Sequence, residues 1–337
     1  MKKLAIFAMV LMLGVTSLGG ASVLANETAE KAVQTIQADQ QKEVKKGILV
    51  VSFGTSHADT RALTIEAAEK QIQKTFPEYD VKRAFTSKMI IKIIDKRDGV
   101  KVNTVEEAME EFKKEGYTDI IVQPLHIMNG AEYDELVEES TPYAESFNTF
   151  EVASPLLTSV EDYKNVAKAL ESQLPERKEG EAVVFMGHGT HHFANSTYPA
   201  MDYVFHDLGY ENVFVGTVEG YPSIEEVKKR LEENKVKKVT LMPFMLVAGD
   251  HAKNDMAGEE EDSWKSILEK AGYEVEIYLH GLGENEGIRN IYASHTQNEI
   301  DQLLAEAAEL KAQEEAKAKE TAEVKEVVVE VKTEEKK

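Results

Sequence analysis

The sequence has 337 residues and no Cys, and its 61 Asp and Glu residues outnumber 39 Lys and Arg residues, giving a formal net charge of −22 at pH 7. Such acidity argues against a nucleic acid or an anionic membrane surface as the partner, because both would be repelled. The absence of Cys excludes a disulfide framework and a lipid anchor attached through Cys. The length is sufficient for two modest α/β units with additional terminal segments.

The N-terminus has the pattern of a secretory signal. Lys2 and Lys3 precede an apolar run at residues 4–15, and a stretch rich in small residues then ends at Ala25. This pattern predicts cleavage after Ala25 and an exported protein, periplasmic or otherwise extracytoplasmic. The run is short for a transmembrane helix, so we expect no stable membrane insertion after cleavage. An uncleaved anchor is the alternative.

Composition divides the rest of the chain into five segments. A polar linker covers residues 26–46, an N-terminal α/β half residues 47–143 and a C-terminal α/β half residues 144–287. A helix at residues 288–309 is expected to pack back on the first half. Residues 310–337 form a charged low-complexity tail, which we expect to be solvated and partly helical or disordered, or to bind a partner as a helix.

Within the two halves, short apolar runs alternate with amphipathic stretches. Residues 47–53 form an apolar run, residues 59–75 have helical spacing, and residues 119–126 form another run. This alternation predicts parallel sheets flanked by helices. Both halves also hold a Gly-Thr turn followed by His, and later an apolar strand with one Pro, Pro124 or Pro243. We therefore predict duplicated halves with a cleft between them.

Three polar residues stand where predicted strands end, and they are His188, Glu219 and His251. Open α/β sheets bind ligands beyond the carboxyl ends of their strands, so we expect these side chains to gather at one site. Two imidazoles and one carboxylate suit either a metal ion or a set of proton-transfer groups. Glu219 could equally be a solvated loop carboxylate, and this alternative stays open.

Other chemistry has little support in the sequence. His57 and His126 also follow predicted strands and could face the same site. The chain has no Cys nucleophile and no Gly-x-Ser-x-Gly motif. Neither a P-loop nor a Gly-x-Gly-x-x-Gly motif follows a strand, so we expect no nucleotide cofactor. The absence of His-Glu-x-x-His excludes the helix-borne zinc protease site.

Several separated motifs together resemble one family. They are Ser52-Phe-Gly-Thr-Ser56, Leu125-His-Ile-Met-Asn129, Met186-Gly-His-Gly-Thr190, Val218-Glu-Gly-Tyr-Pro222 and Pro243-Phe-Met-Leu-Val-Ala-Gly-Asp-His251. In this order they resemble the anaerobic sirohydrochlorin cobaltochelatases, class II chelatases related in fold to ferrochelatase. The resemblance covers about residues 46–302.

The resemblance implies a chelatase-like fold, with two Rossmann-like halves that each hold a parallel sheet and a tetrapyrrole cleft between them. It implies a lyase that inserts Co²⁺, its substrate metal, into sirohydrochlorin without ATP in anaerobic cobalamin biosynthesis. The metal-binding His, Glu and His of the family fall on His188, Glu219 and His251. Since insertion releases two pyrrole protons, we also expect His188 to be the catalytic base.

Sirohydrochlorin is rich in carboxylates, so its site needs cations and N–H donors. The candidate substrate-binding residues are Gly54, Thr55, Ser56, Arg61, Lys88 and His126. Two other functions stay open: an exported carrier of a tetrapyrrole, haem or metal, with His126 or His57 as an axial ligand, and a chelatase that uses Fe²⁺ or Ni²⁺. A homo-oligomer is also possible.

Overall fold

The computed structural model describes residues 44–176 and 178–334. The predicted secretory signal and most of the predicted linker lie outside these residues. Within the described part of the chain, no helix is both long and apolar enough to cross a membrane.

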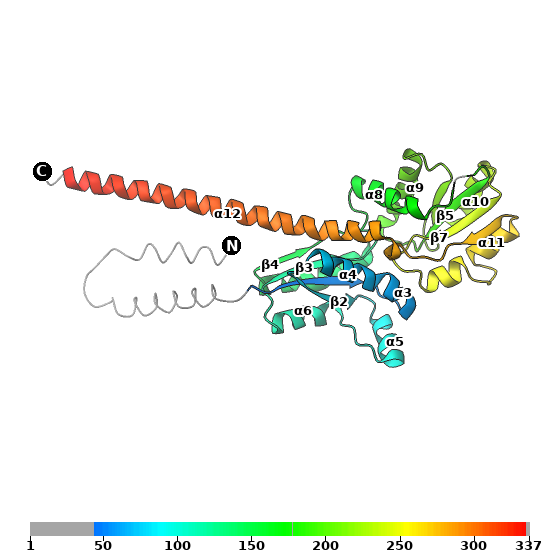
Figure 1. Cartoon of the computed structure of the whole chain (residues 1–337), viewed down its shortest axis with the longest axis horizontal. Coiled ribbons are helices and arrows are strands. Elements are labelled where there is room, and N and C mark those ends of the chain that lie inside the picture. Colours follow the sequence, from blue (N-terminus) through cyan, green and yellow to red (C-terminus); the bar gives the residue numbers. More distant parts are fainter. Residues whose placement is uncertain (1–43, 177, 335–337) are drawn as a thin grey trace. The chain divides into compact units, whose positions relative to one another are not determined.

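The first half is built on a four-stranded parallel sheet (Figure 1). Its strands are β1 (Lys46–Ser52), β2 (Asp80–Phe85), β3 (Asp119–Pro124) and β4 (Thr149–Val152), in the spatial order β2-β1-β3-β4. The two central strands, β1 and β3, are almost fully buried. Their continuous apolar runs follow from this burial, because both faces of the sheet are covered by helices.

The helices of the first half cover both faces of this sheet. They are α3 (Ala58–Leu63), α4 (Ile65–Thr75), α5 (Lys88–Asp98), α6 (Val105–Lys114), α7 (Ala131–Ser140) and the 3₁₀ turn η1 (Thr141–Ser146). Alternate residues of β1 point to opposite faces. Val50 therefore packs in one apolar cluster with Ile72 of α4, and Val51 packs in another with Phe112 of α6.

The second half repeats the plan. Its strands are β5 (Glu181–Gly187), β6 (Val213–Thr217), β7 (Lys238–Pro243) and β8 (Glu274–Ile277), all parallel and in the order β6-β5-β7-β8. Counted from the first strand of each half, this is the order of the first sheet. The predicted fold class, two Rossmann-like halves that each hold a parallel sheet flanked by helices, is confirmed.

The remaining helices belong to the second part of the chain. They are α8 (Val160–Leu170), η2 (Glu171–Gln173), η3 (Phe193–Ser196), α9 (Thr197–Asp207), α10 (Ile224–Glu233), the π-helical turn η4 (Ala252–Met256), α11 (Trp264–Lys270), η5 (Leu282–Glu284) and α12 (Glu286–Glu334). One apolar cluster contains Phe185 and Phe244 of the second half together with Ile48 of the first. The two halves therefore share a core.

The boundary between the halves lies later than the sequence indicated. Residues Thr149–Val152 pair with β3 as the fourth strand of the first sheet, so that sheet extends beyond residue 143, where we had placed the end of the first half. All four residues of β4 are only half-buried. A short edge strand of this kind has a weak hydrophobic signal, which explains the misplaced boundary.

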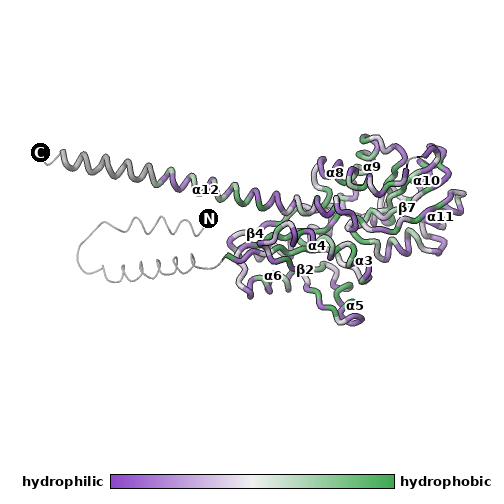
Figure 2. The backbone as a smooth tube through the Cα atoms, in the orientation of Figure 1, coloured by the Kyte–Doolittle hydropathy of each residue, from purple (hydrophilic) through white to green (hydrophobic). Residues whose placement is uncertain are grey.

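The C-terminal helix α12 joins both halves. Tyr292 donates a hydrogen bond from its hydroxyl to the backbone oxygen of Leu125, and Thr296 donates one to the side chain of Gln123, both in the first half. The helix continues to Glu334, so the expected break between a helix at residues 288–309 and a separate tail is absent. Residues 304–318 are exposed and mix polar with apolar side chains (Figure 2). Their Ala, Glu and Lys content favours a continuous helix.

Candidate metal site

His188 directly follows β5, in a turn whose shape depends on glycine. Gly189 has a φ of +85°, and a Cβ atom at this position would lie 2.5 Å from the backbone nitrogen of Gly220. The missing side chain therefore lets two turns meet, those that follow β5 and β6. The backbone N–H of Glu219 donates to the carbonyl oxygen of His188 at 2.8 Å across this contact.

His251 comes from the loop that follows β7 and lies immediately before the π-helical turn η4. Its Nε2 atom is 3.0 Å from Nε2 of His188, and the two rings are nearly perpendicular, at 86°. The residues are 63 positions apart in the sequence. The structure thus brings together two of the three residues that we expected to share a site.

The protons on these rings can be assigned from their outer nitrogens. Nδ1 of His188 lies 2.9 Å from the carbonyl oxygen of Gly189, and Nδ1 of His251 lies 2.5 Å from a carboxylate oxygen of Asp255. Carbonyl and carboxylate oxygens only accept, so both Nδ1 atoms carry hydrogen. In neutral rings both Nε2 atoms then have a lone pair and cannot hydrogen-bond to each other.

A cation between the two facing lone pairs would remove their repulsion. A metal ion about 2.1 Å from each nitrogen would accommodate this spacing with an N–metal–N angle of roughly 90°. Metal-binding His residues commonly donate their second N–H to a carboxylate or a backbone carbonyl, as His251 and His188 do here. The pair therefore has the geometry of two adjacent ligands on one metal ion.

The backbone of Glu219 is hydrogen-bonded to that of His188, but the side chain of Glu219 is exposed. Among the described residues, no group of three or more His, Cys, Asp or Glu side chains is arranged to hold a metal ion. Glu219 thus lies beside the imidazole pair without completing a three-ligand site in this side-chain conformation.

The predicted substrate-binding turn, residues Gly54, Thr55 and Ser56, lies against the loop that carries His251. A Cβ atom on Gly249 would be 3.7 Å from Oγ1 of Thr55. Nε2 of His57, the next residue, is 2.8 Å from a carboxylate oxygen of Asp250. The turn after β1 in the first half is therefore a neighbour of the imidazole pair in the second.

The two predicted substrate-binding cations already face carboxylates. Nε of Arg61, on α3, lies 3.4 Å from Glu66, and Nζ of Lys88, at the start of α5, lies 3.5 Å from Glu139. Lys88 is 58% exposed, whereas Arg61 is buried, and Nη1 of Arg61 is a buried donor without a hydrogen-bond partner in the described part of the chain. Arg61 thus retains one free donor.

His126 follows β3 and is partly exposed as a residue, but both of its ring nitrogens are buried and have no hydrogen-bond partner among residues 44–318. Burial lowers its pKa to about 4, because the charged form would lose its hydration. His126 is therefore neutral near pH 7 and cannot serve there as a cation for substrate carboxylates.

Sequence reasoning missed three charged neighbours of the site, namely Asp250, Lys253 and Asp255. Nζ of Lys253 lies 3.2 Å from Nδ1 of His57. The spacing of four residues between His251 and Asp255 was a usable signal for one of these contacts, because such residues share a helix face. The contacts of Asp250 and Lys253 reach into the other half and have no local signature.

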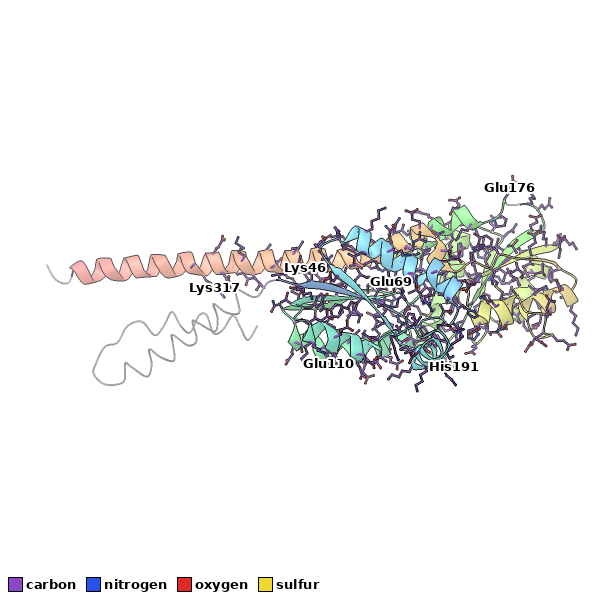
Figure 3. The ribbon with its side chains drawn as sticks, turned by 60° about the horizontal axis from the view of Figure 1, so that its bottom comes forward. Lys46, Glu69, Glu110, Glu176, His191 and Lys317 are labelled. Atoms are coloured by element: carbon purple, nitrogen blue, oxygen red, sulfur yellow. The ribbon has the colours of Figure 1, made fainter. Side chains whose placement is uncertain are left out.

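His191 and His192 follow His188 closely in the sequence but do not join the imidazole pair. His191 is exposed and is labelled in Figure 3. His192 accepts a hydrogen bond from the backbone N–H of Ala194 and lies 3.4 Å from Asp134 on α7. His192 therefore caps η3 and contacts the first half.

The duplicated parallel α/β fold and the imidazole pair beyond its strand ends agree with the expected chelatase class. The family model for cobalt chelatase (CbiK) matches residues 46–301. The chain is 41% identical over 265 residues to the sirohydrochlorin cobaltochelatase of Salmonella typhimurium, covering 79% of this chain and 100% of that protein. The chain belongs to the cobalt chelatase (CbiK) family, which confirms the resemblance found in its motifs.

Two further similarities agree with this assignment. The sirohydrochlorin cobaltochelatase CbiKC of Nitratidesulfovibrio vulgaris is 37% identical over 262 residues, covering 77% of this chain and 92% of that protein. The solved structure of SirB from Bacillus subtilis with Fe³⁺ is 18% identical, with a TM-score of 0.54, and the match covers 75% of this chain and 95% of that one. At this identity SirB supports the fold alone.

Proposed function

We propose that this protein is a sirohydrochlorin cobaltochelatase, a lyase that inserts Co²⁺ into sirohydrochlorin for cobalamin biosynthesis without using ATP. Membership of the cobalt chelatase family and the names of its two relatives support the reaction. The observation on which the proposal depends is the pair of Nε2 atoms 3.0 Å apart on His188 and His251.

Co²⁺ is the substrate metal, and we propose that His188, His251 and Glu219 present it to the macrocycle. Imidazole and carboxylate ligands bind Co²⁺ without the tight hold of thiolates, which suits a site that must release the ion. The backbone of Glu219 is fixed beside His188, so rotation of its flexible side chain can bring the carboxylate toward the imidazole pair. Its negative charge would offset part of the charge of the ion.

Insertion of a divalent ion releases two pyrrole protons, which must pass to bases at the site. We propose that His188 accepts one through Nε2 after the ion has left that atom for the macrocycle, because its Nδ1 is held by the carbonyl of Gly189. His251 can take up the other only once the proton on His188 has passed to solvent, because two Nε2–H groups cannot face each other at 3.0 Å. The Nδ1–H of His251 faces the carboxylate of Asp255, which would stabilise the imidazolium formed when Nε2 takes up a proton.

The test is an anaerobic titration of sirohydrochlorin with Co²⁺, Fe²⁺ and Ni²⁺ in the presence of the protein and in the absence of ATP. We expect the absorption spectrum of the tetrapyrrole to change with Co²⁺, and His188→Ala and His251→Ala to slow the change by about a hundredfold or more. The control is His206→Ala, because His206 contacts Asp202 and Arg230 and no residue of the site.

The same experiment separates the alternatives. A Soret band in the purified protein, together with no cobalt-dependent change in the sirohydrochlorin spectrum, would support a carrier and contradict the chelatase. A faster reaction with Fe²⁺ or Ni²⁺ would keep the chelatase and change its metal. The ligand set alone does not choose among these ions, because their affinities follow a common order and availability decides.

The position of the protein in the cell is a separate proposal. We propose that the chain is exported, because residues 1–25 have the charged, apolar and small-residue regions of a cleavable signal. N-terminal sequencing of the protein from the extracytoplasmic fraction should begin at Asn26. An intact Met1 on protein recovered from the cytoplasm would contradict export.

A further inference from the structure

A small network of polar contacts connects the two halves beside the imidazole pair. His57, in the first half, lies between Asp250 and Lys253 of the second, at 2.8 Å from an oxygen of Asp250 and 3.2 Å from Nζ of Lys253. Lys253 also lies 3.8 Å from a carboxylate oxygen of Asp59. We refer to His57, Asp250 and Lys253 as the clasp.

One neutral form of His57 satisfies both contacts of the clasp. The ammonium of Lys253 can only donate, so Nδ1 of His57 accepts. Nε2 then carries the hydrogen and donates it to Asp250. Both ring nitrogens of His57 are therefore held by one segment of the second half, and Asp250 in that segment is 193 residues away from His57 in the sequence.

The segment held by the clasp is the one that carries His251. Asp250 and Lys253 are three positions apart and share the side of the turn that faces the first half. His251 and Asp255 are four positions apart and share the side that faces His188. A rotation of this turn would therefore move His251 away from His188 and break the clasp at the same time.

The clasp contributes little to the stability of the fold. The side chain of Asp250 is 64% exposed, against 27% for His57 and 31% for Lys253, and ion pairs with an exposed partner contribute little to folding free energy. Its contacts are specific in geometry instead, because they join the loop after β1 to the loop after β7. This combination favours a role in positioning.

We propose that His57 is a positioning residue, whose hydrogen bonds to Asp250 and Lys253 hold the turn that carries His251 and so set the spacing of the His188–His251 pair. This inference rests on the proposed function, since it assumes that the pair receives Co²⁺. His57 itself touches neither metal nor macrocycle in this role. Its contribution should be visible in metal binding before any tetrapyrrole is present.

The experiment measures Co²⁺ binding to the full-length protein without tetrapyrrole, by calorimetry and by the visible absorption bands of bound Co²⁺. We expect His57→Ala to weaken Co²⁺ binding about tenfold, as does loss of residues that orient metal ligands elsewhere. His57→Gln should restore affinity to within about threefold, because a Gln amide can also donate to Asp250 and accept from Lys253.

The matched control is His206→Ala. The side chain of His206 is 30% exposed against 27% for His57, and it also faces an Asp, but it lies on α9 and contacts no residue of the site. We expect its Co²⁺ affinity to equal that of the wild-type protein. Thermal unfolding of each variant shows whether the fold is retained.

Steady-state kinetics give a second readout. A positioning role predicts that His57→Ala raises the KM for Co²⁺ and lowers kcat, with little change in the KM for sirohydrochlorin. A raised KM for sirohydrochlorin with unchanged Co²⁺ affinity would overturn the inference and make His57 a substrate-binding residue. Failure of His57→Gln to restore affinity would also overturn it.

The variant His188→Ala separates failure of this inference from failure of the proposed function. If His188→Ala abolishes Co²⁺ binding and His57→Ala leaves it unchanged, only the positioning role is wrong. If His188→Ala binds Co²⁺ as the wild-type protein does, the proposed metal site itself is wrong.

Discussion

His188 can approach the turn after β6 only because the residue that follows it has no side chain. Gly189 and Gly209 have nearly the same φ, +85° and +84°, but a Cβ atom on Gly209 would meet no atom within 4 Å, whereas one on Gly189 would meet the backbone of Gly220. At both positions a residue with a side chain would strain the left-handed backbone. At Gly189 the side chain would in addition collide with the neighbouring turn, so the two positions allow the strain and the collision to be measured separately.

Gly209→Ala should therefore lower the free energy of unfolding by about 1 kcal/mol, from the left-handed backbone alone. Gly189→Ala should lower it by about 3 kcal/mol, because the turns after β5 and β6 must also move apart. Urea denaturation measures both values. Equal losses for the two variants would show that the contact between the turns contributes nothing.

The hydrogen bond between Asp255 and His251 gives a second prediction at the scale of single residues. Asp255→Asn keeps an acceptor for the imidazole N–H but removes the negative charge that favours a bound cation. We expect Co²⁺ binding to weaken about tenfold with the fold unchanged, as measured by calorimetry. The same affinity in both proteins would mean that the carboxylate only orients the ring.

At the scale of elements, α12 fastens the two halves together through buried polar contacts. His295 of α12 lies 2.9 Å from a carboxylate oxygen of Asp162 on α8, and Tyr292 is buried against the end of β3. Burial raises the pKa of Glu299 on the same helix, and nearby Glu151 on β4 raises it further. Ionisation of Glu299 therefore opposes the contact between α12 and the first sheet.

A raised pKa in the folded state means that stability is lost as the pH rises from the usual pKa of Glu, 4.5, through the higher folded value. Glu299→Gln cannot ionise and should be more stable than the wild-type protein near pH 7. The difference should shrink as the pH falls below about 4, where Glu299 is protonated in both states. Urea denaturation at several pH values measures it, and a difference that is constant with pH would contradict the assignment.

The exposed part of α12 predicts the effect of a truncation. Residues 304–318 are exposed, and the family match ends at residue 301. For a chain that ends at Glu309, the free energy of unfolding should therefore lie within about 0.5 kcal/mol of the value for the full-length protein. A larger loss would show that the distal part of the helix stabilises the fold.

At the scale of the whole molecule, the net charge of −22 acts in opposite directions on the two proposed substrates. It attracts Co²⁺ and repels a carboxylate-rich tetrapyrrole, and salt screens both effects. Raising the salt concentration from about 0.02 to 0.3 M should slow Co²⁺ association and lower the KM for sirohydrochlorin. Stopped-flow measurements check the rate of Co²⁺ association, and steady-state measurements check the KM for sirohydrochlorin. If salt weakened the binding of both substrates, or strengthened the binding of both, the electrostatic explanation would be contradicted.

The sequence predicted the two parallel sheets, because their central strands are continuous apolar runs such as β5. It also indicated His188 and His251, which stand at strand ends where topology gathers residues. It missed β4, whose four residues are half-buried, and the clasp, whose contacts connect distant segments. Burial of the nitrogens of His126 was equally invisible, because it depends on side-chain packing and not on the position of a strand end.

The position of α12 has a consequence for the order in which the chain can fold. Protein synthesis proceeds from the N-terminus, and the end of β3 is covered by Tyr292 and Thr296, which are among the last residues of the fold to leave the ribosome. The first half therefore cannot complete its core while the second is still being made. A chain that stays incomplete until its final helix arrives leaves part of the apolar core of its first half uncovered until synthesis is almost finished.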